Sequence, residues 1–445
     1  MCAKRLKNSR AMQMSLKTDK PEAPNSLSRL VANKCVFPLI PSYNIIQRLT
    51  LSSLSAPKSS YSPGDMIQLI FNQASDAVIG ANSYLIFQAG QYSANTAIFD
   101  LASGSALNFI NRMELVAADG TTIDLLPYAN NWYQTKYRWS MSNQWLSTYG
   151  SLLGFTATLP TTYSGAAGVN IAVSGAASTL PWFLIPLSFI SEIFAADQQL
   201  LLPFLIGGLR MNLSLETAAV AYKYTDGSPT VANTYVVNNL RLVTCNVQLQ
   251  DNILALLQEM TGKQGSNYFY NQVWNVPNVL SSTTSYNLMT TKGVAQADML
   301  AVKSRITAAT TDAASDSFKA ETFLATSSQT VYGSVSFPQA AVASDKEALM
   351  QGYWAFEKTM DRRDPSNVSY QSFVGGASSP QGDALVAAVN LNRSPDVALA
   401  GIAINNSKSL QTNITMSTSV ARTMDVFLQY LTCLEVYLNR VIPRT

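Results

Sequence analysis

Short segments with the pattern of β-strands recur along almost the whole chain, and they constrain its fold more than any other feature. The clearest are residues 209–215 (LRMNLSL) and 240–249 (LRLVTCNVQL). Both alternate polar and apolar side chains with the period of two that a half-buried strand shows. Turn sequences such as SPGD at 62–65 and DGSP at 226–229 separate the segments. Many short strands joined by turns rich in proline and glycine predict β-sandwiches or jelly rolls.

The same pattern predicts strands in both halves of the chain. In the first half they are residues 66–71, 84–87, 111–116 and 121–126. In the second half they are residues 272–276, 300–306, 330–337, 398–404, 411–416 and 424–437, the last being two strands or one long strand.

Only two segments predict helices, residues 253–261 and residues 344–360. In the second segment, Ser344 and Glu347 have the spacing of a capping box at a helix N-terminus. An apolar stripe follows at helical spacing, formed by Leu349, Tyr353, Phe356 and Met360. We expect this helix to pack on its own sheet.

The length of 445 residues exceeds what one hydrophobic core usually supports, so two domains are expected. We divide the chain into a basic arm (residues 1–45), a first β domain (46–255) and a second β domain (256–445), with a short helical or loop connection near residues 251–272. Charged residues make up only 13% of the chain, and such a neutral surface suits a protein that buries much of itself against its own copies.

Charge is distributed unevenly, because residues 1–34 hold eight basic and two acidic groups, while the rest of the chain holds 22 basic and 25 acidic groups. The candidate contact residues of this arm are Lys4, Arg5, Lys7, Arg10, Lys17 and Lys20. One interpretation is a solvated chain terminus. The other is an arm that contacts nucleic acid or neighbouring subunits inside an assembly.

The residues argue against catalysis. Histidine is absent, which removes the commonest general base and the commonest neutral metal ligand. Four scattered cysteines (Cys2, Cys35, Cys245, Cys433) form no metal or redox motif and are expected to be reduced thiols. The charged cluster at 361–364 (DRRD) is expected to be a solvated loop. No secretory signal is expected, and prolines and charges in the apolar run 181–211 argue against a membrane-spanning helix.

Several short motifs, in their order along the chain, resemble one known family. In the first half they are YSPGD at 61–65, SALNFINRMELV at 105–116 leading into a helix-like stretch after Tyr128, and LIPLSF at 184–189. In the second half they are AVKSRI at 301–306, Phe337-Pro338 before the predicted helix, and DVFLQY at 425–430. The chain is similar in this order to the double jelly-roll major capsid proteins of eukaryotic DNA viruses, of the polinton-like virus, adintovirus and virophage type. Residues 151–177 have no counterpart in that pattern.

The resemblance implies an all-β fold of two tandem jelly rolls with a few short helices. It also implies a structural protein without cofactors that trimerises into pseudo-hexameric capsomers and builds an icosahedral shell around a DNA genome. Its expected partners are itself, minor capsid and penton proteins, and genomic DNA or an internal membrane through the arm. The expected location is the virion, after assembly in the cytoplasm or nucleus of the host cell. The alternatives are a viral vertex, fibre or lectin-like β-sandwich that binds a receptor or glycan, and a histidine-free glycosidase with two carboxylates.

Overall fold

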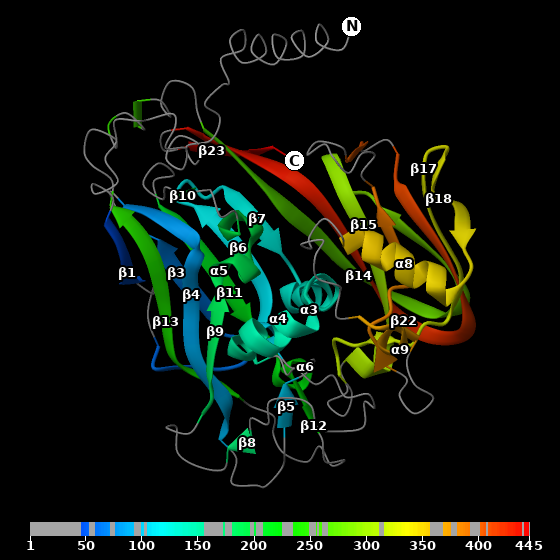
Figure 1. Ribbon diagram of the computed structural model, residues 1–445, viewed down its shortest axis with the longest axis horizontal. Helices are drawn as coiled ribbons and strands as arrows, with labels where there is room; N and C mark the ends of the chain where they lie inside the picture. The colour runs from blue at the N-terminus through cyan, green and yellow to red at the C-terminus, as the bar shows by residue number, and fades with distance from the viewer. Residues whose placement is uncertain are drawn as a thin grey trace, which may run out of the picture.

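The strands of the protein form two β units that lie side by side in the computed structural model (Figure 1). The structure describes the following residues: 46–52, 58–71, 76–92, 99–101, 105–154, 172–173, 180–195, 200–201, 208–224, 235–248, 255, 258–259, 266–310, 316–356, 368–374, 381–391, 401–405, 408–437 and 440–444. Among these, the strands up to residue 248 pair only with one another, and so do the strands from residue 266 onward. We call residues 46–248 the N-terminal unit and residues 266–444 the C-terminal unit.

The N-terminal unit has two larger sheets. The first is built on the order β1-β13-β4-β10, to which β2, β8 and β9 add further pairs. Its strands are β1 (Ile46–Ser52), β2 (Ser60–Tyr61), β4 (Asp76–Tyr92), β8 (Ala172–Val173), β9 (Trp182–Pro186), β10 (Leu200–Leu201) and β13 (Val236–Gln248). The second has the order β3-β11-β6-β7, formed by β3 (Met66–Phe71), β6 (Ile110–Ala117), β7 (Thr122–Leu126) and β11 (Leu209–Leu215). A small separate pair joins β5 (Phe99–Leu101) and β12 (Tyr222–Tyr224).

Short helices connect the strands of the N-terminal unit. They are η3 (Ala106–Phe109), α3 (Ala129–Ser140), α4 (Asn143–Thr148), η4 (Tyr149–Leu153), α5 (Leu187–Ile190), η6 (Glu192–Phe194) and α6 (Ala218–Ala221). Except for α3, each is six residues or shorter, so they act as connections between strands rather than as a helical layer.

The C-terminal unit is built around one long strand pair. Strand β14 (Ser266–Thr290) runs antiparallel to β22 (Leu410–Tyr437), from Ser266 opposite Val436 to Thr290 opposite Leu410. Around this pair lie β15 (Val294–Ile306), β17 (Ala325–Tyr332), β18 (Val335–Val342), β20 (Ala387–Asn390), β21 (Ile402–Ile404) and β23 (Arg440–Arg444). The remaining elements are η7 (Thr307–Thr310), α8 (Asp345–Phe356), α9 (Tyr370–Val374) and the short pair β16 (Ala320–Glu321) and β19 (Gln381–Gly382).

Strand β22 curves strongly (Figure 1), and two successive parts of it, within residues 410–430, face one core. Its first part pairs with β17 and its later part with β15. Register shifts in the β14 pairing between Leu280 and Ser285 mark the irregular stretch between those two parts. Side chains from both parts, including Ile414 and Val426, belong to the same apolar cluster. The single sheet therefore wraps around its own core as a sandwich does.

Most predicted strands are confirmed, usually as parts of longer ones. Residues 66–71 and 209–215 match β3 and β11, and β11 buries its four apolar residues Leu209, Met211, Leu213 and Leu215. In β13 the alternation is interrupted at Asn239, which has a left-handed backbone (φ 52°) at a bulge. The segments 411–416 and 424–437 both belong to β22.

One strand prediction is wrong. Residues 330–337 are a hairpin of β17 and β18 that turns at Gly333 (φ 62°), since glycine adopts this left-handed conformation without steric cost. Apolar residues on both sides of the turn give residues 330–337 the sequence pattern of one continuous strand.

The second predicted helix is α8, and its capping contacts are present. The Ser344 hydroxyl accepts a hydrogen bond from the Glu347 amide at 3.2 Å, and the Glu347 carboxylate accepts one from the Ala343 amide at 3.0 Å. The helix packs on β20 and β15 of its own unit, as expected, and also on α3 of the other unit. Residues 357–367, including Met360 and the cluster 361–364, lie outside the described residues.

Two further predictions are only partly covered. Of the predicted helix 253–261, the described positions 255, 258 and 259 are helical. The boundary between residues 255 and 256 stays a prediction. No helix in the described part of the chain is long and apolar enough to cross a membrane.

Candidate functional site between the two units

Helix α3 of the N-terminal unit lies in the contact between the two units, which we call the seam (Figure 1). The helix begins after Tyr128, which has a left-handed backbone (φ 49°), and ten of its twelve residues are buried. It packs on η3 and β6 of its own unit and on α8 of the other. A helix covered on most of its sides has no single apolar stripe. Helix α3 is therefore enclosed between the two sandwiches.

Aromatic rings of α3 contact aromatic rings of the C-terminal unit. The ring centroid of Trp132 is 5.2 Å from that of Phe427 on β22 and 6.1 Å from that of Phe356 on α8. Two helical turns further on, the ring centroid of Trp139 lies 5.8 Å from that of Phe356 and 6.0 Å from that of Phe373 on α9. One apolar cluster accordingly continues from the N-terminal unit into the C-terminal unit. A contact with a shared apolar core fixes the relative orientation of the two units.

Side chains of β14 pair with backbone carbonyls of the other unit. Strand β7 ends the strand order of its sheet, and its Ile123 carbonyl accepts hydrogen bonds from the Tyr270 hydroxyl at 2.7 Å and the Gln272 amide at 2.5 Å. The Asn275 amide donates to the Tyr128 carbonyl at 3.1 Å, just before α3 begins. These bonds satisfy carbonyl groups that would be costly to bury without a partner.

A buried lysine of the C-terminal unit also reaches across the seam to α3. Lys303 of β15 is 4% exposed, and its ammonium nitrogen donates to Asn131 Oδ1 at 2.8 Å and to Thr135 Oγ1 at 3.2 Å on α3. Burial, followed by the charge of the neighbouring Arg305, lowers the pKa of Lys303 to about 7. The charged and neutral forms of this side chain are therefore both accessible near neutral pH.

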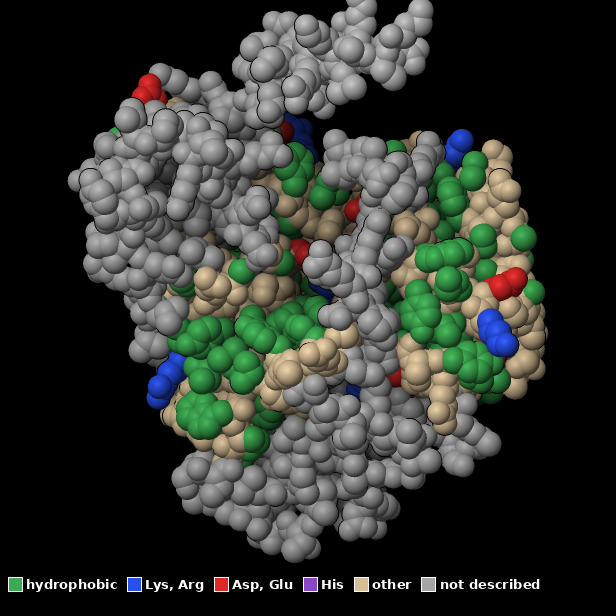
Figure 2. All heavy atoms as spheres, viewed as in Figure 1, with side chains coloured by type: hydrophobic (Ala, Val, Ile, Leu, Met, Phe, Trp, Pro, Cys, Tyr) green, Lys and Arg blue, Asp and Glu red, His purple; other side chains and the backbone are tan. Residues whose placement is uncertain are grey.

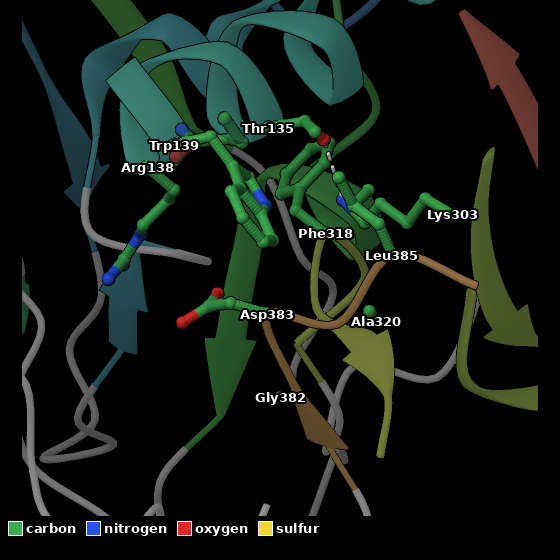
Figure 3. Close-up of a pocket in the computed structure, with 10 residues that line it drawn as sticks. Thr135, Arg138, Trp139, Lys303, Phe318, Ala320, Gly382, Asp383 and Leu385 are labelled. Carbon is green, nitrogen blue, oxygen red and sulfur yellow. Dashed lines mark hydrogen bonds between the residues drawn. The ribbon is translucent and has the colours of Figure 1, made fainter. Parts of the chain in front are cut away.

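Four of the charged groups near Lys303 form two ion pairs of their own. Arg305 binds both carboxylate oxygens of Asp425, at 2.6 and 2.8 Å, and Lys319 binds Asp383 at 2.8 Å. Burial, followed by the charge of Arg138 on α3, lowers the pKa of Lys319. Figure 3 shows Arg138, Asp383 and Lys303 around a small cavity of about 10 Å³ between α3 and the C-terminal unit.

A second cluster of buried polar side chains lies beside α3, around Asp124 and Lys136. The Ser191 hydroxyl donates to the carboxylate of Asp124 at 2.5 Å, and Lys136 forms an ion pair with Glu192. Burial raises the pKa of Asp124 to about 6 and lowers that of Lys136 to about 8. These groups line a cavity of about 20 Å³ that reaches residues of β14.

The geometry of the seam suits holding two units together better than binding a substrate. The two cavities described above have room for about one water molecule each, which is too little for an organic ligand. Among the described residues, no three cysteine, aspartate or glutamate side chains gather where they could hold a metal ion. Of the cysteines that the structure describes, Cys245 and Cys433 form no disulfide bond. That the chain uses no cofactor and catalyses no reaction stays a prediction.

Comparison with known proteins gives a match in structure alone. No protein-family model and no curated protein sequence matches the chain. A quasi-atomic model of the PBCV-1 virus capsid superposes with a TM-score of 0.60 at 11% identity, covering 90% of this chain and 97% of that one. The Faustovirus major capsid protein gives 0.59 at 10% identity and covers 98% of both chains. The Sputnik virophage structure at 3.5 Å gives 0.54 at 12% identity, with 90% and 88% covered.

These neighbours are double jelly-roll proteins, and the likeness spans both units. The chain has the double jelly-roll fold. The predicted fold class, all-β with two tandem jelly rolls and few helices, is confirmed, since the residues that the structure describes are mostly in strands. In a double jelly roll the seam has a clear role, because it sets how the two rolls stand relative to each other.

The arm residues proposed from the sequence, Lys4, Arg5, Lys7, Arg10, Lys17 and Lys20, lie outside the described residues and stay a prediction. Reasoning from individual residues missed the seam and α3, although the resemblance placed a helix-like stretch after Tyr128. The available signal was the density of aromatic residues in 132–139 (WYQTKYRW). Such density is unusual for an exposed connection and typical of a buried contact.

Proposed function

We propose that this chain is a major capsid protein, which builds an icosahedral virion shell and catalyses no reaction. The observation that carries the proposal is the likeness to the Faustovirus major capsid protein, which covers 98% of both chains. A match over both jelly rolls and the seam favours a shared architecture over the chance likeness of one sandwich. Vertex, fibre, lectin and glycosidase functions have no comparable support.

Trimers with a pseudo-hexagonal outline are the proposed building block. Each subunit supplies two similar sandwiches, so three subunits supply six, and six units of similar shape tile a hexagonal lattice. The aromatic contacts of Trp132 and Trp139 support this assembly, because a lattice requires both rolls at a constant angle. A pair of flexibly linked sandwiches would not give identical capsomers.

Exposed apolar side chains on both units support self-association. Figure 2 shows apolar side chains gathered over α8 and over the region of α4 and β9. Large apolar residues that are about half exposed are Met350 and Trp354 on α8, Tyr149 on η4 and Trp182 on β9. Tryptophan, tyrosine and methionine are enriched at protein interfaces. We propose that neighbouring subunits bury these residues in the assembled shell.

The proposed location is the shell of the virion, after synthesis and assembly in the cytoplasm or nucleus of the host cell. Minor capsid and penton proteins are proposed as further partners. The basic arm at residues 1–45 is proposed to face the interior, where its six candidate cations would contact the DNA genome or an internal membrane.

Light scattering and electron microscopy of the purified protein test the assembly. Trimers that convert into closed shells as concentration rises are the expected result. A protein that stays monomeric at all concentrations and ionic strengths would contradict the proposal. Trp354→Ser is expected to weaken trimers or shells, whereas Leu125→Ser, at an exposed position away from the two apolar groups, serves as the matched control.

Binding of the arm to DNA is tested separately, with the six candidate lysines and arginines replaced by glutamine. Loss of six phosphate contacts is expected to lower the slope of log affinity against log salt by up to about five. Unchanged affinity and slope would exclude the genome as the partner of the arm. Binding to anionic vesicles, measured with the same variant, distinguishes an internal membrane.

A further inference from the structure

The hydrogen bonds of Lys303 fit an uncharged amine better than an ammonium group. A neutral amine has two N–H donors, and Lys303 has two acceptors across the seam, Asn131 Oδ1 and Thr135 Oγ1. An ammonium group has three donors and needs a counter-charge when it is buried. Both acceptors are uncharged, and they belong to α3 of the other unit. Figure 3 shows Lys303 reaching toward Thr135 from its strand.

Two of the three carboxylates that act on Lys303 form ion pairs with other cations. Asp425 lies directly opposite Lys303 in the β15–β22 register, yet both of its oxygens bind Arg305. Asp383 binds Lys319. The charged groups that face Lys303 from its own strand and from the elements packed around it are Arg305, Asp425, Asp316, Lys319, Asp383 and Arg138.

Counting Lys303, this cluster contains four cations and three carboxylates, so protonated Lys303 adds an uncompensated charge. A buried charge without a counter-charge is costly, and a protein relieves the cost by favouring the neutral form of the group. The pKa of Lys303, lowered to about 7, agrees with this geometry.

We propose that Lys303 makes the seam a pH-responsive joint, in which the neutral amine fastens the two jelly rolls together and its protonation loosens them as the pH falls. The proposal rests on the contact between the two units and does not depend on the capsid function. A monomer that never assembles would still show it.

The direction of the pH effect on the stability of the seam follows from proton linkage. In the folded state the pKa of Lys303 is about 7, whereas in the unfolded chain it is near the ordinary lysine value of 10.5. Between these values the folded state binds fewer protons, so the stability of the seam rises with pH. Below pH 7 the full cost of the buried charge is present.

Other titrating groups at the seam act in identifiable ranges. The raised pKa of Asp124, about 6, affects stability mainly below pH 6, and in the opposite direction, since its burial cost grows as the pH rises. Lys136, with a pKa of about 8, and Lys319, whose pKa is also lowered, act in the same direction as Lys303. A comparison of variants at position 303 separates the contribution of Lys303 from these groups.

Hydrogen exchange of the α3 amides, corrected for the intrinsic effect of pH, tests the proposal in the full-length protein. From pH 6 to pH 8.5 the protection of α3 in the native sequence is expected to rise by at least about tenfold, because each pH unit above the pKa adds up to tenfold. Protection that stays constant or falls over this range would overturn the proposal without any variant.

Two substitutions give the matched comparison. Lys303→Met keeps the length and apolar part of the side chain, so it is expected to give high protection at pH 6 and a smaller rise with pH. Lys303→Arg stays charged and is expected to give low protection at both pH values. Lys408→Met, at an exposed lysine of the same unit, is expected to follow the native profile. A rise in Lys303→Met equal to the native rise would assign the effect to other groups and refute the role of Lys303.

Discussion

At the scale of single residues, the seam depends on the absence of a side chain at Gly352. This glycine lies within α8, and a Cβ atom built on it would be 2.4 Å from Cζ3 of Trp139. Glycine-to-alanine substitutions inside helices usually stabilise a protein by up to about 1 kcal/mol. We predict that Gly352→Ala does the opposite and lowers the free energy of unfolding by about 1–3 kcal/mol, because the indole is packed among rings and cannot move aside. Denaturant unfolding measures the difference.

The control for this prediction is Gln351→Ala, one position earlier in the same helix and only partly buried. It is expected to change stability by less than about 0.5 kcal/mol. Stabilisation by Gly352→Ala equal to that of an ordinary helical site would show that α3 and α8 are not in close contact.

At the scale of elements, a strand or helix could be predicted from the sequence where its alternation of polar and apolar residues matches its exposed and buried faces. Strand β11 has one buried and one more exposed face, so its alternation of Leu209, Met211 and Leu213 with polar residues revealed it. Helix α3 is covered by both units, and its buried residues include polar ones such as Asn131 and Gln134, so it lacks the division into an apolar buried face and a polar exposed face that marks a surface helix. Its environment comes from residues more than 160 positions away, such as Lys303, and no local pattern contains that information.

The contribution of α3 as an element is testable at Trp132, which is 3% exposed and contacts both α8 and β22. We predict that Trp132→Ala lowers the free energy of unfolding by about 3–5 kcal/mol, since it removes a large buried side chain and leaves a cavity in the seam. Trp182→Ala, at a tryptophan that is 49% exposed on β9, is the matched control and is expected to cost much less. Equal losses of stability in the two variants would contradict the position of α3 between the two units.

At the scale of the whole molecule, the seam predicts that the two jelly rolls unfold together. Two domains joined by a small polar contact usually unfold separately. Here one apolar cluster contains residues of both units, such as Leu115 of β6 and Phe427 of β22, so opening one unit exposes the core of the other. We predict a single calorimetric transition for the native protein, with the calorimetric enthalpy equal to the van't Hoff enthalpy. Trp132→Ala is expected to split this transition into two, because it removes the ring of α3 that contacts both α8 and β22, whereas Trp182→Ala is expected to leave it single. Two separate transitions in the native protein would mean that the rolls are independent domains, and the seam could then not hold them at the constant angle that a capsid lattice requires.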